Sequence, residues 1–238
     1  MANEPQRVVL FDVDGTLVRT EGASRHSRAF RAAFKSVYGT ECRFVPGLHG
    51  MTDMQIFMTL AKSMGLGGER VRELAREACR HMVAIYQTPE EGDGHYIDLP
   101  GARATVETLA ARGAMLGLVT GNTLEIALHK LASVGLEGFF AFGAYGTEAW
   151  DRSGLPPIAV ARAERLIGKP IDPRTVFVVG DTPRDVACAL DNGYRSVAVA
   201  TGSFGIPELL AAGAELVLPD LQDSGPLLQI VEEAGLAL

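Results

Sequence analysis

Apolar and polar residues along the chain form two patterns, one typical of strands and one typical of helices. Near the start, four large apolar residues in a row, Val8–Phe11, are followed by the turn signal Asp14-Gly15. An uninterrupted apolar run that ends in a turn is typical of a strand buried within a parallel sheet. Later runs of this kind predict five further strands, at 115–119, 139–142, 176–179, 196–199 and 216–218.

Helical periodicity fills the intervals between the later strands. Apolar residues recur at spacings of three and four within 102–111, 124–134 and 158–167. Strands that alternate with helices of about 10–15 residues indicate right-handed βαβ units. We therefore expect an α/β domain with a doubly wound parallel sheet, made of residues 1–18 and 96–238.

The segment between the first two predicted strands has a helical pattern of apolar residues and lacks strand-like runs. No strand-like run occurs between Glu21 and Gln87, whereas apolar residues recur at helical spacing around Phe30, Phe57 and Leu74. We predict an all-helical domain over 19–95, inserted after the first strand. Basic residues on the side of its first helix opposite Phe30 and Phe34 are expected to face solvent, with electrostatic steering of the substrate as the alternative. They are Arg25, Arg28, Arg31 and Lys35.

Composition narrows the class of protein. The chain has 238 residues, 47% of them hydrophobic, which excludes disorder. No apolar stretch approaches the roughly 18 residues of a membrane-spanning helix, and the first seven residues do not resemble a secretion signal. Cys42, Cys79 and Cys188 are odd in number and widely spaced, which fits reduced thiols in the cytoplasm. We therefore expect a cytoplasmic protein that does not bind a membrane.

Charge gives a further exclusion. Twenty-two Lys and Arg residues against 29 Asp and Glu residues give a net charge of −7, which argues against a nucleic-acid-binding protein. A small anion remains a possible ligand, because a few cations in one cleft suffice to bind a phosphate. The five histidines show no spacing typical of a metal site. Neither the charge nor the composition indicates the oligomeric state, and we expect a monomer or a weak dimer.

Polar residues collect where the predicted strands end, which is where ligands bind in open α/β sheets. Asp12 and Asp14 follow the first strand, and two apart in extended chain they lie about 6.6 Å apart on the same side. Thr120 and Asp181 follow two other strands. Clustered carboxylates favour Mg²⁺, and a carboxylate can also attack phosphorus while a second one transfers protons. Alternatively, an isolated Asp-x-Asp is a loop with two solvated acids, but its place after a buried strand favours a catalytic site.

Three motifs in this order resemble the haloacid dehalogenase superfamily, in the group that includes phosphoglycolate phosphatases and β-phosphoglucomutases. The motifs span nearly the whole chain and are Phe11-Asp12-Val13-Asp14-Gly15-Thr16-Leu17, Leu118-Val119-Thr120-Gly121-Asn122, and Val178-Val179-Gly180-Asp181-Thr182-Pro183-Arg184-Asp185. The resemblance implies a Rossmann-like sheet with a helical cap. It also implies that Asp12 is the nucleophile and Asp14 the general acid and base, a pair typical of phosphoryl transfer rather than of dehalogenation.

The resemblance implies the other site residues as well. Mg²⁺ is expected on the Asp12 side chain, the Asp14 carbonyl oxygen and Asp181, with Asp185 either near the metal or only capping a helix. The transferring phosphoryl oxygens are expected on Thr120 and on the backbone of two further residues, Gly121 and Asn122.

The fourth motif of this superfamily is a Lys or Arg before the helix that precedes the Asp181 strand. Lys169 follows that helix, whereas Arg152 precedes it, so Arg152 is the better candidate. Its planar guanidinium could bridge the nucleophile and a phosphoryl oxygen. A solvated residue at the start of a helix is the alternative.

A glycine-containing loop in the helical insert is the last candidate. In capped relatives such a loop reads the leaving group of the substrate, and here Thr52 and Asp53 follow Gly50 and would bind it. Equally, Thr52 could simply cap the next helix.

We therefore expect a Mg²⁺-dependent phosphatase that hydrolyses a small phosphorylated metabolite through an aspartyl-phosphate. A phosphomutase and a non-catalytic phosphate-binding regulatory module are the alternatives.

Overall fold

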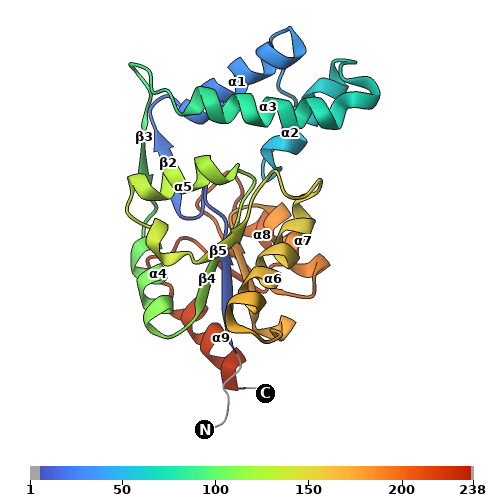
Figure 1. Cartoon of the computed structure of the whole chain (residues 1–238). Coiled ribbons are helices and arrows are strands. Elements are labelled where there is room, and N and C mark those ends of the chain that lie inside the picture. Colours follow the sequence, from blue (N-terminus) through green and yellow to red (C-terminus); the bar gives the residue numbers. More distant parts are fainter. Residues whose placement is uncertain (1–5, 237–238) are drawn as a thin grey trace.

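The computed structural model of the chain describes residues 6–236. Its centre is a six-stranded parallel sheet with the strand order β5-β4-β1-β6-β7-β8 (Figure 1). The strands are β1 (Val8–Phe11), β4 (Met115–Val119), β5 (Phe142–Ala144), β6 (Val176–Gly180), β7 (Arg195–Val199) and β8 (Leu216–Leu218). The first strand lies in the middle of the sheet, which explains why its apolar run is uninterrupted.

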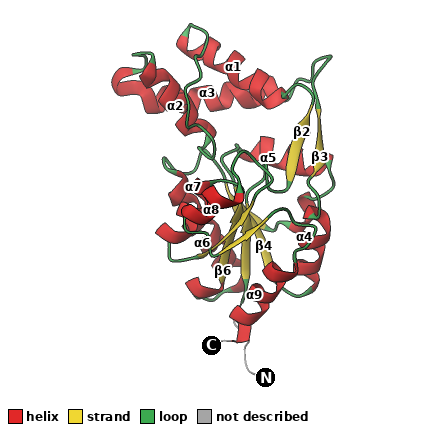
Figure 2. Ribbon diagram, turned by 180° about the vertical axis from the view of Figure 1, so that it is seen from behind, coloured by secondary structure: helices red, strands yellow, loops and turns green. Residues whose placement is uncertain are grey.

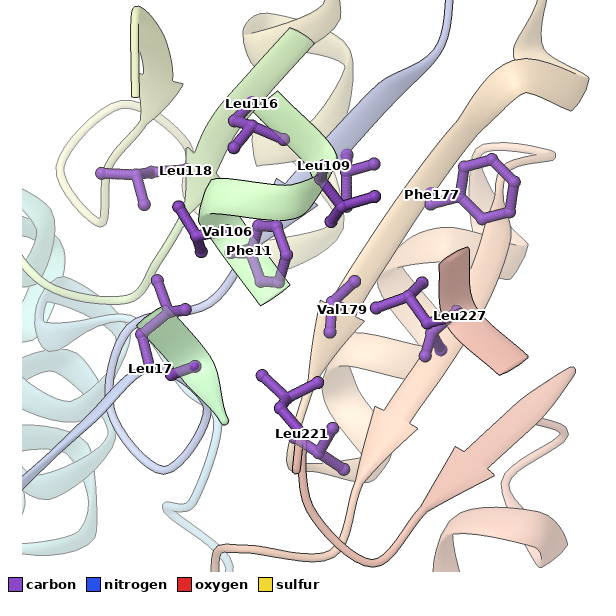
Figure 3. Close-up of a cluster of buried hydrophobic side chains, with 14 of the residues drawn as sticks. Phe11, Leu17, Val106, Leu109, Leu116, Leu118, Phe177, Val179, Leu221 and Leu227 are labelled. Atoms are coloured by element: carbon purple, nitrogen blue, oxygen red, sulfur yellow. The ribbon is translucent and has the colours of Figure 1, made fainter. Parts of the chain in front are cut away.

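Helices cover both faces of this sheet (Figure 2). Alternate residues of β1 serve the two faces: Val9 and Phe11 belong to one apolar cluster, and Val8 and Leu10 to another. Figure 3 shows the first cluster, in which Phe11 and Val179 of the sheet lie near Val106 and Leu227 of the covering helices. The helices are α4 (Ala102–Ala111), α5 (Leu124–Ser133), α6 (Leu155–Ile167), α7 (Pro183–Asp191), α8 (Ile206–Ala211) and α9 (Gly225–Leu236). The predicted doubly wound α/β fold is confirmed.

A separate helical layer lies over one end of the sheet (Figure 1). It consists of α1 (Arg25–Tyr38), α2 (Asp53–Ser63) and α3 (Val71–Tyr86), which share an apolar cluster of their own. Phe30 of α1 stacks on Phe57 of α2, with 3.9 Å between the ring centroids. The inserted helical segment predicted after the first strand is therefore present, and we call it the cap.

Two antiparallel strands, β2 (Val18–Glu21) and β3 (His95–Asp98), join the cap to the sheet domain. They were not predicted, because each is four residues long and largely exposed on one face, so neither forms an apolar run. The predicted domain borders at 18/19 and 95/96 fall at this strand pair, and the exact division stays a prediction. Short 3₁₀ turns complete the chain at Gly68–Arg70, Glu137–Phe139, Arg152–Gly154 and Pro173–Thr175.

Some predicted element bounds were wrong. The strand expected at 139–142 begins only at Phe142, because a 3₁₀ turn occupies Glu137–Phe139. The helix expected at 158–167 begins at Leu155, since Pro156 and Pro157 fit its first turn, where no backbone N–H is required. Within residues 6–236, we find no helix long and apolar enough to cross a membrane.

Two of the four basic residues on α1 also differ from the expectation of a solvated face. The guanidinium of Arg25 lies over the ring of Tyr86, 4.6 Å from its centroid. Arg28 binds Asp93 through two hydrogen bonds, of 2.9 and 2.8 Å. Tertiary partners from α3 and from the segment that follows it therefore hold part of this basic face.

Candidate active site

The carboxyl ends of three adjacent strands bring distant residues to one edge of the sheet. Strand β1 pairs in parallel with both β4 and β6, so Asp12, Thr120 and Asp181 follow strands that end side by side. A cavity of about 590 Å³ opens between this edge and the cap. These three residues line it, together with Asp14 and Arg152. The topology therefore assembles the three sequence motifs into one site.

Three carboxylates form a buried acidic cluster at the bottom of the site. One oxygen each from Asp12, Asp181 and Asp185 lies within 4.8 Å of the others. Burial, together with the charge of nearby carboxylates, raises the pKa of both Asp12 and Asp181 above the ordinary value. A cation bound between them would reverse this shift by favouring their ionised forms.

The acidic cluster fits a divalent metal ion. Asp181 Oδ1 is buried and has no hydrogen-bond partner among residues 6–236, so it can coordinate an ion. The backbone at Gly202 also approaches this carboxylate closely. A Cβ atom at Gly202 would lie only 1.7 Å from Asp181 Oδ2, so a side chain there would collide with it. All-oxygen sites of this kind suit Mg²⁺.

Asp185 differs from the other two acids, because both of its oxygens already have partners. Its Oδ1 accepts from Arg152 Nη2 at 2.5 Å, and its Oδ2 accepts from the Thr182 backbone N–H at 3.1 Å and hydroxyl at 2.6 Å. The contacts with Thr182 form the capping box expected at the start of α7. Asp185 therefore holds Arg152 and caps a helix, in addition to lying near Asp12.

Arg152 is the cation that pairs with Asp12. The 3₁₀ turn before α6 places its buried side chain at the sheet edge, where Nη2 lies 3.0 Å from Asp12 Oδ1. Its Nη1 donates to the backbone oxygen of Gly50 in the cap, at 3.0 Å. Lys169 follows the opposite end of α6, past the C-cap Gly168. The two candidates for the fourth motif thus lie at opposite ends of α6. Of the two, Arg152 lies beside Asp12.

Asp14 has a partner that the sequence did not reveal. Lys130 Nζ lies 2.8 and 2.6 Å from its two carboxylate oxygens, and Asn122 Nδ2 donates to one of them at 2.7 Å. Although burial acts to raise the pKa of Asp14, the charge of Lys130 holds it below the ordinary value. The sequence contained one sign of this pair. Lys130 lies with Ala127 and Leu131 on the apolar face of α5, and a lysine buried on such a face requires a partner of opposite charge.

The cap supplies a second pair that sequence reasoning missed. His26 Nδ1 lies 3.2 Å from Lys130 Nζ, and its Nε2 lies 3.1 Å from a carboxylate oxygen of Asp53. Histidine spacing alone did not indicate this role, because the partners come from α5 and α2. Asp53, predicted to bind substrate, lines the cavity, as does His26.

The motif after β4, Thr120-Gly121-Asn122, also lines the site. Thr120 is buried, and its hydroxyl accepts from Asn122 Nδ2 at 2.8 Å. The backbone oxygen of Gly121 accepts from the Asp53 N–H at 2.8 Å, which ties this motif to the cap. A Cβ atom at Gly121 would lie 2.5 Å from the Met51 backbone oxygen, so only glycine permits this approach.

Thr52, like Asp185, is a predicted site residue that lies outside the cavity lining. Its hydroxyl accepts from the Gln55 N–H at 3.1 Å, and the Gln55 side chain accepts from the Thr52 N–H at 3.0 Å. This reciprocal pair is the capping box at the start of α2. Of the two interpretations of Thr52, the structure therefore supports the helix cap.

Comparison with known proteins agrees with this geometry. A family model described as haloacid dehalogenase-like hydrolase matches residues 6–193. A phosphoglycolate phosphatase from Shigella boydii is 27% identical over 219 residues, covering 84% of this chain and 83% of the relative. The pyrophosphatase PpaX from Halalkalibacterium halodurans is 28% identical over 223 residues, covering 90% and 94%.

A solved structure shows the same fold. The β-phosphoglucomutase of Clostridium difficile superposes with a TM-score of 0.68 at 19% identity, covering 96% of this chain and 98% of that one. The family match covers most of the chain, and the acidic strand ends lie at one edge of a parallel sheet. The chain belongs to the haloacid dehalogenase-like hydrolase family.

Proposed function

We propose that this protein is a Mg²⁺-dependent phosphatase that hydrolyses a small phosphomonoester through an aspartyl-phosphate on Asp12. The observation that carries this proposal is that two carboxylates line the cavity and each has its own cation, with Asp12 paired to Arg152 and Asp14 to Lys130. One carboxylate is thus held for attack and the other for proton transfer.

In the proposed first step, an Asp12 oxygen attacks phosphorus and the bond to the leaving oxygen breaks. Asp14 donates a proton to that oxygen, so the leaving group departs as an alcohol. The arriving phosphoryl anion favours the protonated form of Asp14, because like charges close together raise a carboxyl pKa. Arg152 offsets the charge of both Asp12 and the phosphoryl oxygens.

In the proposed second step, water attacks the phosphorus of the aspartyl-phosphate. Asp14, now ionised, accepts a proton from this water, and the bond between phosphorus and the Asp12 oxygen breaks to release phosphate. Thr120 and the backbone of Gly121 and Asn122 would bind the phosphoryl oxygens during both steps.

Asp12 and Asp181, with the Asp14 carbonyl oxygen, would hold Mg²⁺, and Asp185 would orient Arg152 beside them. The bound ion would neutralise charge on the phosphoryl oxygens.

Phosphate release from 4-nitrophenyl phosphate tests the proposal. With Mg²⁺, the wild type should turn over, whereas a chelator or the Asp12→Asn substitution should lower kcat by about 1000-fold or more, because the nucleophile or the counter-charge is missing. Asp172→Asn, at an exposed turn away from the cavity, is the matched control. Undiminished turnover by Asp12→Asn would disprove the mechanism.

A second variant identifies the intermediate. Asp14→Asn should still be phosphorylated by this substrate, because nitrophenolate leaves without a proton, but it should release phosphate slowly. Mass spectrometry of the acid-quenched variant should then find the phosphoryl group on Asp12. A phosphomutase would instead require a bisphosphate activator, and a regulatory module would show no turnover.

A further inference from the structure

The cavity has two chemically different halves. The sheet-edge half carries the acids and Arg152, whereas the cap half is largely apolar. The apolar residues that line the cap half are Phe44, Val45, Pro46, Leu48, Met51 and Ile56. If the phosphoryl group binds at the sheet edge, as proposed above, the leaving group of the substrate must lie against these residues.

The cap half has neither Lys nor Arg among the described residues that line it. Its polar side chains are His26, His49 and Asp53. Both ring nitrogens of His26 already have partners, on Lys130 and Asp53. The ring of His49 packs edge-on against Phe204. The fixed charge in this half is therefore the carboxylate of Asp53.

Three arginines in or near the cavity already have partners. Arg184 donates to the backbone oxygens of His49 and Gly47, each at 3.0 Å. Arg31 lies over the ring of Phe44, 4.6 Å from its centroid. Arg152, the one arginine in the described lining, binds two carboxylates and a cap carbonyl.

We propose that the leaving group is neutral or cationic and partly apolar, and that phosphomonoesters with a carboxylate or a second phosphate on the leaving group are poor substrates. An anion in the cap half would lose water without gaining a counter-ion, and it would lie near Asp14 and Asp53. This inference rests on the proposed function and deepens it. It predicts that this chain prefers a different substrate from the relative named for phosphoglycolate, a phosphomonoester whose leaving group carries a carboxylate.

Matched aryl phosphates test this proposal with the Mg²⁺-loaded wild type. Phenyl phosphate, 4-carboxyphenyl phosphate and 4-(aminomethyl)phenyl phosphate differ mainly in the charge at one end of the leaving group. We expect kcat/KM for the carboxylate to be about tenfold or more below that for the neutral ester, because an unpaired charge is strongly rejected. The cationic ester should match or exceed the neutral one. The pair 2-phosphoglycolate and 2-hydroxyethyl phosphate should show the same order.

A charge introduced into the cap half gives the reciprocal test. Ile56→Lys places a cation beside the apolar lining and should raise the relative kcat/KM for 4-carboxyphenyl phosphate by about tenfold, whereas Ile56→Met should keep the wild-type order. Equal rates across the wild-type series, or a preference for the carboxylates, would overturn the inference. Absence of turnover with every ester would instead disprove the proposed phosphatase activity.

Discussion

Lys130 is a charged residue at a position that the helical periodicity of α5 assigns to the buried, apolar face. Its neighbours on α5, Ala127 and Leu131, face the buried core, and its own side chain is 2% exposed. A buried ammonium group is costly unless it is paired and hydrogen-bonded. Lys130 meets that requirement with Asp14, Asn122 and His26, which come from three different parts of the chain.

Removal of Lys130 should impair proton transfer more than phosphoryl transfer. In Lys130→Met, Asp14 loses a contact that orients it, so kcat/KM for an alkyl phosphate should fall about 100-fold. The value of kcat/KM for 4-nitrophenyl phosphate should fall less than about tenfold, because it reports on formation of the aspartyl-phosphate, which needs no proton for this leaving group. Steady-state kinetics with both esters measure this difference. Lys169→Met, which changes a lysine remote from the cavity, should leave both rates unchanged. An equal fall with both esters would indicate general damage to the site.

At the scale of elements, ion pairs attach the cap helices to the segment that returns to the sheet domain. Arg28 on α1 donates to both oxygens of Asp93, which precedes β3. These hydrogen bonds lower the pKa of Asp93 to about 2. Glu90 binds the same guanidinium at 2.8 Å but is more exposed. The sequence showed only a basic face and a polar loop, and packing of α1 on α3 brought them together.

The Asp93 pair should stabilise the protein in a defined pH range. Because the folded-state pKa lies below the ordinary value near 4, the stabilisation is complete above about pH 4 and disappears as pH falls toward 2. Asp93→Asn should therefore be less stable than the wild type at pH 7, and most of the difference should be lost by pH 2. Urea unfolding at several pH values measures this, with Glu90→Gln as the control for an exposed pair. A difference as large at pH 2 as at pH 7 would contradict the assignment.

At the scale of the whole molecule, the loop before α2, at residues 47–50, is held over the sheet edge through its backbone oxygens. Arg152 and Arg184 reach the loop from the sheet domain and bind the backbone oxygens of Gly47, His49 and Gly50. The N–H of Asp53 donates in the opposite direction, to Gly121. Contacts of this kind depend little on the side chains that line the cavity, so the lining can determine specificity while the loop stays in place.

Loss of one anchor should weaken substrate binding more than it slows chemistry. Arg184→Ala removes two hydrogen bonds of about 1 kcal/mol each, which corresponds to a rise in KM of about fivefold to thirtyfold. The value of kcat should stay within about twofold of the wild type, because Arg184 touches neither Asp12 nor Asp14. Steady-state kinetics measure both constants, and Arg174→Ala, which changes an exposed arginine paired with Asp172, is the control. A fall in kcat with unchanged KM would contradict the anchoring role.

The sequence alone determined the fold class and the acidic rim of the site. A buried apolar strand can end only at the edge of a sheet, so Asp12, Thr120 and Asp181 had to lie together once the sheet was parallel. Helix polarity likewise distinguished Arg152 from Lys169. These conclusions depend on local periodicity and on chain direction, and both can be read directly from the amino-acid sequence.

Tertiary structure decided which side chains face one another across elements. Lys130 beside Asp14, His26 beside Asp53, and Arg28 beside Asp93 all join residues at least 27 positions apart. The apolar character of the cap half also became visible only in the structure, where the loop before α2 and the motif after β4 line one cavity. Such contacts follow from how the helices pack on the sheet, and no repeat or spacing in the sequence encodes that packing.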